Sequence, residues 1–317
     1  MPREREIIDQ LTRALAIMKK RTLQNDDVST VKAGDRILAF KCDMFVRSTD
    51  APRQMKKWQM ARKSVVSCAS DFACKGIKPL ASLISLGIPR NFAYKDIQEL
   101  AKGFKVAEKE FDVNIVGGDT NESNDLVIDC CMVGFADRIV KRAGARNDDL
   151  IITSGPFGYS SSGLKILQNK AKASSQFSRR ARNAVFMPKA RVGFGLGLAS
   201  YASSAMDSSD GLAITLSELS EHSRKRFIID SLPATYEVRE FAKANRYDIK
   251  KLVLQGGEEY EIVATIPKHN LRKVLALARK NGCWLFVIGH VEAGKGVFMK
   301  EDAKLKRVEK RGWEHLS

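Results

Sequence analysis

Acidic side chains recur in short clusters, most of them where a predicted strand or helix ends. The clusters are Asp26-Asp27, Asp43, Asp71, Gly117-Gly118-Asp119-Thr120 and Asp207-Ser208-Ser209-Asp210-Gly211. Carboxylates repel one another, so several that converge on one pocket need a compensating cation. Mg²⁺ prefers such hard oxygen ligands and typically bridges protein carboxylates and substrate phosphates. Taken together, the clusters favour a magnesium site for a phosphorylated ligand.

Any single cluster also has a simpler explanation. Asp207 and Asp210 flank two serines just before a helix expected from about Leu212, and Asp and Ser are preferred N-cap residues. Asp119 follows two glycines after an apolar strand, where backbone can approach a ligand closely. Helix capping and ligand binding are both open at this point.

The sequence lacks the signatures of several other enzyme classes. It has no HExxH, no Cys/His metal spacing, no GxSxG and no GxxxxGK[ST], which disfavours zinc hydrolases, serine hydrolases and P-loop nucleotide triphosphatases. Glycine is paired with acids instead, at 117–119 and 256–259. The six cysteines show no CxxC pair and no framework spacing, which indicates reduced thiols and a cytoplasmic protein.

The elements expected to position these residues alternate between strands and helices. Strands are expected at 36–46, 81–88, 113–116, 126–135 and 150–153. Met55–Lys75 predicts a helix that Gly76 ends, and apolar residues three and four apart over Ala93–Phe111 predict an amphipathic helix. The segment GGDTNESND is expected to be a loop, and the basic stretch Lys170–Arg182 a mobile loop.

Length and charge bound the fold and the partners. A chain of 317 residues is typical of about two domains, and a charged segment near 137–145 marks the predicted junction. The net charge of +17 favours anionic partners. The longest apolar stretch, 79–89, is about half the length of a membrane helix, so no membrane span is expected. Nucleic-acid binding is disfavoured, because no RNP-like aromatic pattern, zinc finger or basic zipper is present.

Six motifs in order resemble the thiamine-monophosphate kinase family, of the aminoimidazole ribonucleotide synthetase superfamily. They are VGGDT (116–120), KRAGARNDD (141–149), SGPFGYSSSGL (154–164), MDSSDGL (206–212), QGGEEYEIV (255–263) and IGHV (288–291). The resemblance implies a mixed α/β (α+β) fold with two domains, an ATP/Mg-binding and dimerisation domain at 1–137 and an α/β domain at 138–317. It also implies a homodimer that uses ATP and several Mg²⁺ ions to phosphorylate thiamine monophosphate to thiamine diphosphate.

The same resemblance assigns residues where the motifs match. The implied metal ligands are Asp27, Asp43, Asp71, Asp119, Asp207 and Asp210. The implied ATP contacts are Gly118, Asp119, Arg142 and Ser209, with Arg142 stabilising the phosphate charges. On the acceptor side the implied residues are Asp50, Glu258 and Trp313.

Three positions depart from the family pattern. Lys41-Cys42 replaces a Ser-Thr pair that ligates metal, so Lys41 either supplies an ammonium in place of a bound cation or points elsewhere. Asp50 takes the place of a substrate histidine, with Arg47 and Arg53 nearby as phosphate contacts. Asn25 replaces a glycine and tolerates positive φ.

The chemistry implied is in-line transfer of the ATP γ-phosphoryl group, which needs charge neutralisation and alignment but no protein nucleophile. Three related activities are alternatives: aminoimidazole ribonucleotide synthetase, selenophosphate synthetase and the hydrogenase-maturation carbamoyl dehydratase. The last would need a C-terminal cysteine, but the chain ends Glu314-His315-Leu316-Ser317. Selenophosphate synthetase would need a reactive residue near the N-terminus, whereas the first cysteine, Cys42, falls within a predicted strand.

Overall fold

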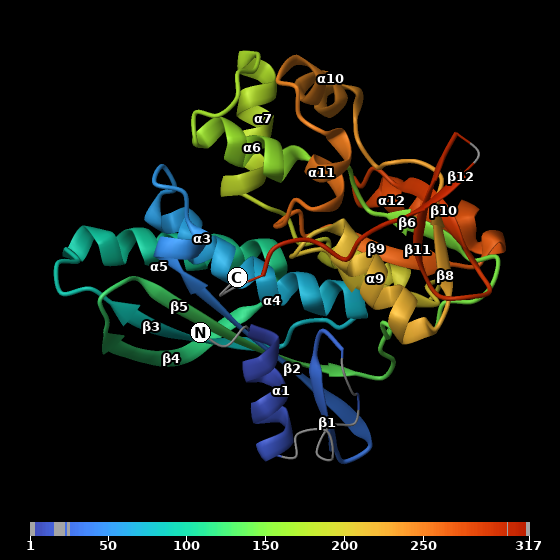
Figure 1. Ribbon diagram of the computed structural model, residues 1–317. Helices are drawn as coiled ribbons and strands as arrows, with labels where there is room; N and C mark the ends of the chain where they lie inside the picture. Colours follow the sequence, from blue (N-terminus) through green and yellow to red (C-terminus); the bar gives the residue numbers. More distant parts are fainter. Residues whose placement is uncertain (1–3, 16–22, 24–25, 303, 315–317) are drawn as a thin grey trace.

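The computed structural model describes residues 4–15, 23, 26–302 and 304–314, and these residues form two sheets with helices packed against them (Figure 1). The first sheet has five strands in the order β1-β2-β5-β3-β4. The elements of this half are α1 (Glu4–Ala14), β1 (Ser29–Ala33), β2 (Arg36–Val46), α3 (Arg47–Asp50), α4 (Lys57–Lys75), β3 (Ala81–Ile88), α5 (Tyr94–Phe111), β4 (Asn114–Glu122) and β5 (Val127–Ala136).

The second sheet has seven strands in the order β12-β11-β8-β10-β6-β9-β7. Its strands are β6 (Leu150–Thr153), β7 (Ser204–Asp207), β8 (Arg226–Ile229), β9 (Ile262–Ile266), β10 (Phe286–Glu292), β11 (Gly296–Glu301) and β12 (Lys304–Arg307). Its helices are α6 (Tyr159–Leu167), α7 (Ser175–Phe186), α8 (Val192–Leu198), α9 (Leu212–Ser223), α10 (Tyr236–Ala244), α11 (Ile249–Leu254) and α12 (Leu271–Lys280). The mixed α/β class expected from the sequence is confirmed.

The five-stranded sheet buries one face under helices and leaves the other open. Alternate residues of β5 such as Ile128, Cys130 and Met132 pack into a core with α4 and α5, as the two-residue period of a strand requires. Residues of the opposite face remain exposed, among them Met44 and Leu83. The open face therefore exposes large apolar side chains.

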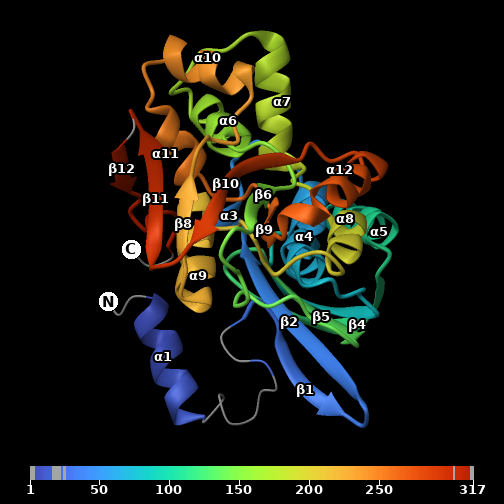
Figure 2. The ribbon, with the colours of Figure 1, turned by 90° about the vertical axis from the view of Figure 1, so that its right-hand side faces the viewer.

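Helix α4 lies between the two sheets (Figures 1 and 2). It contacts β2, β5 and α5 on one side and β7, β9 and α8 on the other, and 15 of its 19 residues are buried. A helix that is packed on all sides usually has apolar residues on every face. The exceptions carry charge: Arg62, Lys63, Asp71 and Lys75 are buried in it. Gly76 ends the helix in the left-handed conformation, as expected.

Two expected loops are regular structure instead. Ser174 caps α7 by accepting a hydrogen bond from the amide of Phe177, and Phe177, Ala181 and Val185 bury one face of the helix. The basic residues that surround this apolar spacing led to a loop prediction for 170–182 that is wrong from Ser175 onward, whereas 170–174 have no regular structure. Strand β4 likewise continues through Gly117-Gly118-Asp119 to Glu122, because its parallel pairing with β3 does not end at Val116.

None of the helices in the described ranges is long and apolar enough to cross a bilayer.

Gly118 is required by this pairing. A Cβ atom at position 118 would collide with the backbone carbonyl of Ile84 on β3, whereas one at position 117 would meet only the Leu83 side chain, at 3.5 Å. We expect Gly118→Ala to lower the free energy of unfolding by about 1–3 kcal/mol, since β3 and β4 must separate to admit the methyl group. Urea denaturation measures this loss, with Gly117→Ala as the neighbouring control. Equal stability of the two variants would contradict the close approach of the strands.

Candidate active site

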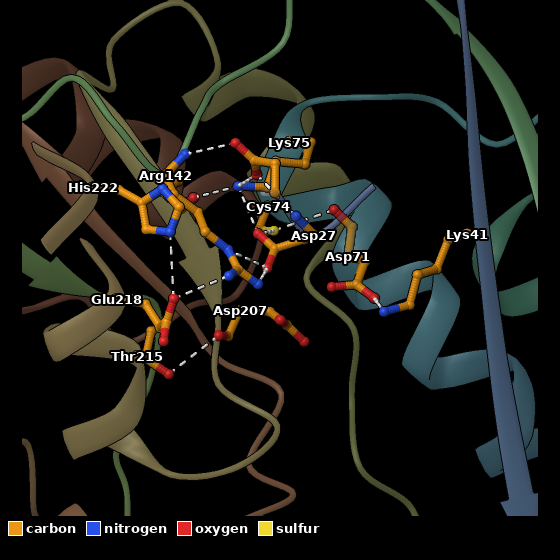
Figure 3. A network of polar contacts seen from close by, with 12 residues as sticks. Asp27, Lys41, Asp71, Cys74, Lys75, Arg142, Asp207, Thr215, Glu218 and His222 are labelled. Atoms are coloured by element: carbon orange, nitrogen blue, oxygen red, sulfur yellow. Dashed lines mark hydrogen bonds and ion pairs between the residues drawn. The ribbon is translucent and has the colours of Figure 1, made fainter. Parts of the chain in front are cut away.

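Helix α4 presents a polar face to the junction of the two sheets (Figure 3). Asp71 and Lys75 lie one helical turn apart, with Cys74 between them in sequence. Ligand atoms of Asp27, Asp71 and Cys74 all lie within 4.8 Å of one another. The carboxylates are suitable ligands for a hard divalent cation, whereas the soft sulfur of Cys74 is not.

Asp71 is buried, and its charge partner is Lys41 on β2. The Nζ atom of Lys41 lies 2.7 Å from a carboxylate oxygen of Asp71 and 3.7 Å from one of Asp43. Burial raises the pKa of Asp71, and the nearby carboxylates of Asp207, Asp27 and Asp43 raise it further, against the attraction of Lys41. Burial alone would lower the pKa of Lys41, but Asp71 and Asp43 outweigh it and raise that pKa. Lys41 therefore points into a group of carboxylates that we call the acidic cluster. Its members are Asp26, Asp27, Asp43, Asp71 and Asp207.

Lys75 has no solvent exposure and is surrounded by oxygen atoms. Its Nζ atom lies 2.6 Å from each of three acceptors, which belong to Asp26, Asp27 and the backbone carbonyl of Ala205. An ammonium group has three protons, so every one is used. The network ties helix α4 to the segment before β1 and to strand β7.

Arg142 lies in the loop between the two sheets and contacts the same acids. Its Nε donates to Asp27 over 2.9 Å, a terminal guanidinium nitrogen donates to the same oxygen, and its backbone amide donates to Asp26. Burial would raise the pKa of Asp27, but the charges of Lys75 and Arg142 outweigh it and lower that pKa. The other side of the guanidinium donates to Glu218 over 3.2 Å.

Asp207 ends strand β7 and faces α4. The hydroxyl of Ser70 donates to its carboxylate over 2.8 Å, and burial, reinforced by repulsion from Asp27, raises its pKa to about 6. The helix-capping explanation for this motif is wrong: the N-cap of α9 is Gly211, and no side chain caps it. The close approach of buried carboxylates leaves negative charge that a divalent cation would neutralise.

Two of the residues predicted for the acceptor side, Asp50 and Glu258, lie around Lys63, two turns from Asp71 toward the N-terminal end of α4. Lys63 is buried, donates to the backbone carbonyl of Asp50 over 2.9 Å and forms an ion pair with Glu258. The carboxylate of Asp50 accepts a hydrogen bond from the amide of Val46 and so closes the short helix α3. Arg47 and Arg53 are exposed beside it.

Trp313 reaches the same region from the C-terminal segment. Its amide donates to the carbonyl of Asp210 over 2.9 Å, and its Cβ packs near Gly257, next to Glu258. The amide of Glu258 in turn donates to the carbonyl of Ser209. The motifs at 207–211 and 256–261 therefore lie side by side, with Trp313 against both.

Asp119 and Gly118 are not brought to the acidic cluster within one chain. Asp43, Cys130, Ile84 and Gly118 form one row across β2, β5, β3 and β4, so Gly118 is three strands, or about 14 Å, from Asp43. Asp119 follows in the next row, with Ser85, and points to the open face of the sheet. Their roles stay predictions.

Sequence reasoning missed Lys63 and Lys75 as members of the site. The available signal was a lysine within a helix whose other residues are small or apolar on all sides, since an ammonium is rarely buried without a partner. Asp26 was likewise noted in a cluster but not assigned a role.

Comparisons with known proteins agree with the motifs. The family model for the N-terminal domain of the AIR synthase related proteins matches residues 25–136 of this chain. The model for the C-terminal domain of the same family matches residues 146–301. The thiamine-monophosphate kinase of Nitrosopumilus maritimus is 44% identical over 92% of this chain and 93% of its own, and that of Pyrococcus horikoshii is 37% identical over 92% and 90%. The chain belongs to the thiamine-monophosphate kinase family.

Solved structures of this family share the fold. A structure titled as AaThiL complexed with AMPPCP and TMP covers 99% of this chain and 97% of its own, with a TM-score of 0.86 and 27% identity. The thiamine monophosphate kinase of Aquifex aeolicus superposes with a TM-score of 0.81 at 26% identity, covering 96% and 99%. Structures of the hydrogenase maturation protein HypE are 17–19% identical and show a common fold alone.

The buried network around Lys75 predicts a large stability effect in this member of the family. Lys75→Met leaves the carboxylates of Asp26 and Asp27 buried and short of a partner, and we expect it to lower the free energy of unfolding by about 3–5 kcal/mol in metal-free buffer. Lys78→Met, which removes the exposed pair with Asp112, should change it by less than about 1 kcal/mol. Chemical denaturation compares the two, and a similar small effect for both would show that Lys75 does not hold the junction.

Proposed function

We propose that this chain transfers the γ-phosphoryl group of ATP to thiamine monophosphate and so forms thiamine diphosphate. The observation that carries the proposal is the placement of two sites on one helix. The acidic cluster at Asp71 and the acceptor residues at Lys63 lie eight residues apart on α4, which is about 12 Å along its axis. The related enzymes named above support the same reaction.

The acidic cluster fits Mg²⁺ in its donor chemistry. Asp27, Asp71, Asp207 and Asp210 would hold magnesium ions, with Asp43 beside them and Asp119 at a further position. Bound Mg²⁺ would neutralise and align the phosphates of the two substrates. Arg142 adds a fixed positive charge beside Asp27, and Ser209 lies next to Asp210 where the nucleotide phosphates would meet the cluster. No side chain has to act as a nucleophile, because the acceptor phosphate is already an anion.

The residues predicted for the acceptor side would suit the flat and cationic rings of thiamine monophosphate. Trp313 is half exposed and offers an aromatic face, and Glu258 offers a carboxylate opposite a cationic ring. The backbone carbonyl of Asp50 accepts a hydrogen bond from Lys63. In this chain, Asp50 would therefore support the acceptor side by positioning Lys63.

Measurement of ADP release tests the proposal directly. Purified protein with ATP and Mg²⁺ should release ADP when thiamine monophosphate is the acceptor and form thiamine diphosphate in equal amount. A precursor of aminoimidazole ribonucleotide, which tests the synthetase alternative, should give only the acceptor-free rate. A preference for that acceptor would replace the kinase assignment by the ligase alternative.

Trp313 provides a selective test of the acceptor pocket. We expect Trp313→Ala to raise the KM for thiamine monophosphate about tenfold, equivalent to about 1.4 kcal/mol, since it removes the aromatic face. The KM for ATP should stay close to the wild-type value. Trp284→Ala, at another exposed indole in the loop before β10, is the control and should change neither constant. A parallel rise in both constants for Trp313→Ala would mean that Trp313 supports the fold only.

We further propose that two copies pair through the open face of the five-stranded sheet, within a domain spanning 1–137 that binds ATP and Mg²⁺, while 138–317 forms the second domain. Val31, Met44, Leu83 and Val116 are exposed on this sheet, and an apolar patch of this kind is typical of an interface. Asp119 points to the same face, so a phosphate role for it calls for a second chain. A cytoplasmic location, favoured by six free cysteines, completes the proposal.

Light scattering at micromolar concentration should give twice the chain mass. Leu83→Lys should yield monomers, because it places a charge in the apolar face. Leu305→Lys, at an equally exposed leucine on β12, should leave the dimer intact. A monomeric wild-type protein would exclude this interface.

A further inference from the structure

Two lysines occupy the acidic cluster in the manner of bound cations. Lys75 is coordinated by three oxygen atoms at 2.6 Å, and Lys41 lies between the carboxylates of Asp71 and Asp43. Both ammonium groups are attached to rigid elements, the C-terminal turn of α4 and the central part of strand β2. They differ from a metal ion in that they cannot dissociate.

The charges of the cluster can be counted. Five carboxylates take part, and they belong to Asp26, Asp27, Asp43, Asp71 and Asp207. Three cationic side chains, Lys41, Lys75 and Arg142, contact them. Arg142 is shared with Glu218, which Lys310 also contacts, so six carboxylates and four cations leave two negative charges. One divalent cation is sufficient to neutralise this remainder.

The positions of the ion pairs locate the place left for that cation. Lys41 approaches Asp71 from the side of β2. Asp27 and Asp207 lie on the opposite side of Asp71 (Figure 3). Lys75 and Arg142 approach Asp27 from the side away from Asp71. The gap bounded by Asp27, Asp71 and Asp207 is thus the part of the cluster without a cationic side chain among the described residues.

We propose that Lys41 serves as a built-in cation in place of a metal ion between Asp43 and Asp71, with Lys75 doing the same at Asp26 and Asp27, so that the nucleotide-free chain takes up a single Mg²⁺ ion. This inference rests on the proposed function for the presence of Mg²⁺ and adds how many ions the protein itself holds. Removal of the Lys41 ammonium should expose a second metal position, because Asp43 and Asp71 then face each other without compensation.

Metal counting tests this without reference to turnover. Equilibrium dialysis of nucleotide-free protein should give about one Mg²⁺ per chain for the wild type and about two for Lys41→Met, since the freed carboxylates gain a divalent partner. Lys41→Arg keeps the charge and should keep the wild-type count. Lys32→Met removes an exposed lysine from the neighbouring strand β1 and should also leave the count unchanged.

Thermal melting provides a second readout. Lys41→Met should be less stable than the wild type in metal-free buffer, because Asp71 loses its partner, and saturating Mg²⁺ should restore more of its Tm than it adds to the wild type. Lys41→Ser, which places a short polar side chain beside the carboxylates, covers the case in which the methionine variant does not fold. A count and a Tm response equal to those of the wild type in the folded variant would overturn the inference.

The result of the metal count can be distinguished from the result of the ADP-release test of the proposed function. A wild type that phosphorylates thiamine monophosphate and binds two or more Mg²⁺ ions without nucleotide would refute the built-in cations and leave the kinase assignment standing. One bound Mg²⁺ that becomes two in Lys41→Met, in a protein without ADP release on thiamine monophosphate, would support the inference and refute the kinase assignment.

Discussion

The structure depends on the balance of buried charge along helix α4. Burying an ion is costly unless partners of opposite charge replace its hydration, and α4 buries both acids and bases. Lys75 meets Asp26 and Asp27, Asp71 meets Lys41, and Lys63 meets Glu258. Each partner comes from a different segment of the chain, so the charges hold only when those segments are assembled around the helix.

This requirement joins the two sheets. The core on one side of α4 contains residues of β2 and β5, and the core on the other contains Ala73 and Cys74 with residues of β9. Apolar packing stabilises both sides but does not fix one relative placement, whereas the bonds from Lys75 to Ala205 and from Ser70 to Asp207 have definite geometry. The polar contacts that fix the position of the second sheet relative to α4 are thus the same contacts that shape the acidic cluster.

The order of the motifs was sufficient to predict the family and the mixed α/β class. Apolar spacing and stop residues predicted most elements, including strand 36–46 and the helix ending at Gly76. Local patterns carry that information, because a strand or a helix end depends on neighbouring residues. The local pattern signals that Lys63 and Lys75 are buried, but it does not identify their partners, since those lie far away in sequence. The strand through Gly117 and Gly118 was missed for the same reason: what extends it is the pairing with β3 and not its own composition.

Fixed ammonium groups and bound metal ions solve the same electrostatic problem in different ways. A metal ion can enter and leave with the nucleotide, so its charge is available only when it is bound. An ammonium on β2 or α4 is present throughout the cycle, and its attachment to a rigid element costs no ordering at the moment of substrate binding. Two substrates that each carry phosphate repel one another on approach. At the proposed site, the permanent positive charge beside Asp71 and Asp27 would lower that repulsion. The same permanence has a limit, because a lysine presents three donors and no open coordination position, so it can neutralise carboxylates but cannot bridge them to a phosphate oxygen as Mg²⁺ does. That difference is the physical reason for proposing lysines at the edge of the cluster and a metal position at Asp27, Asp71 and Asp207.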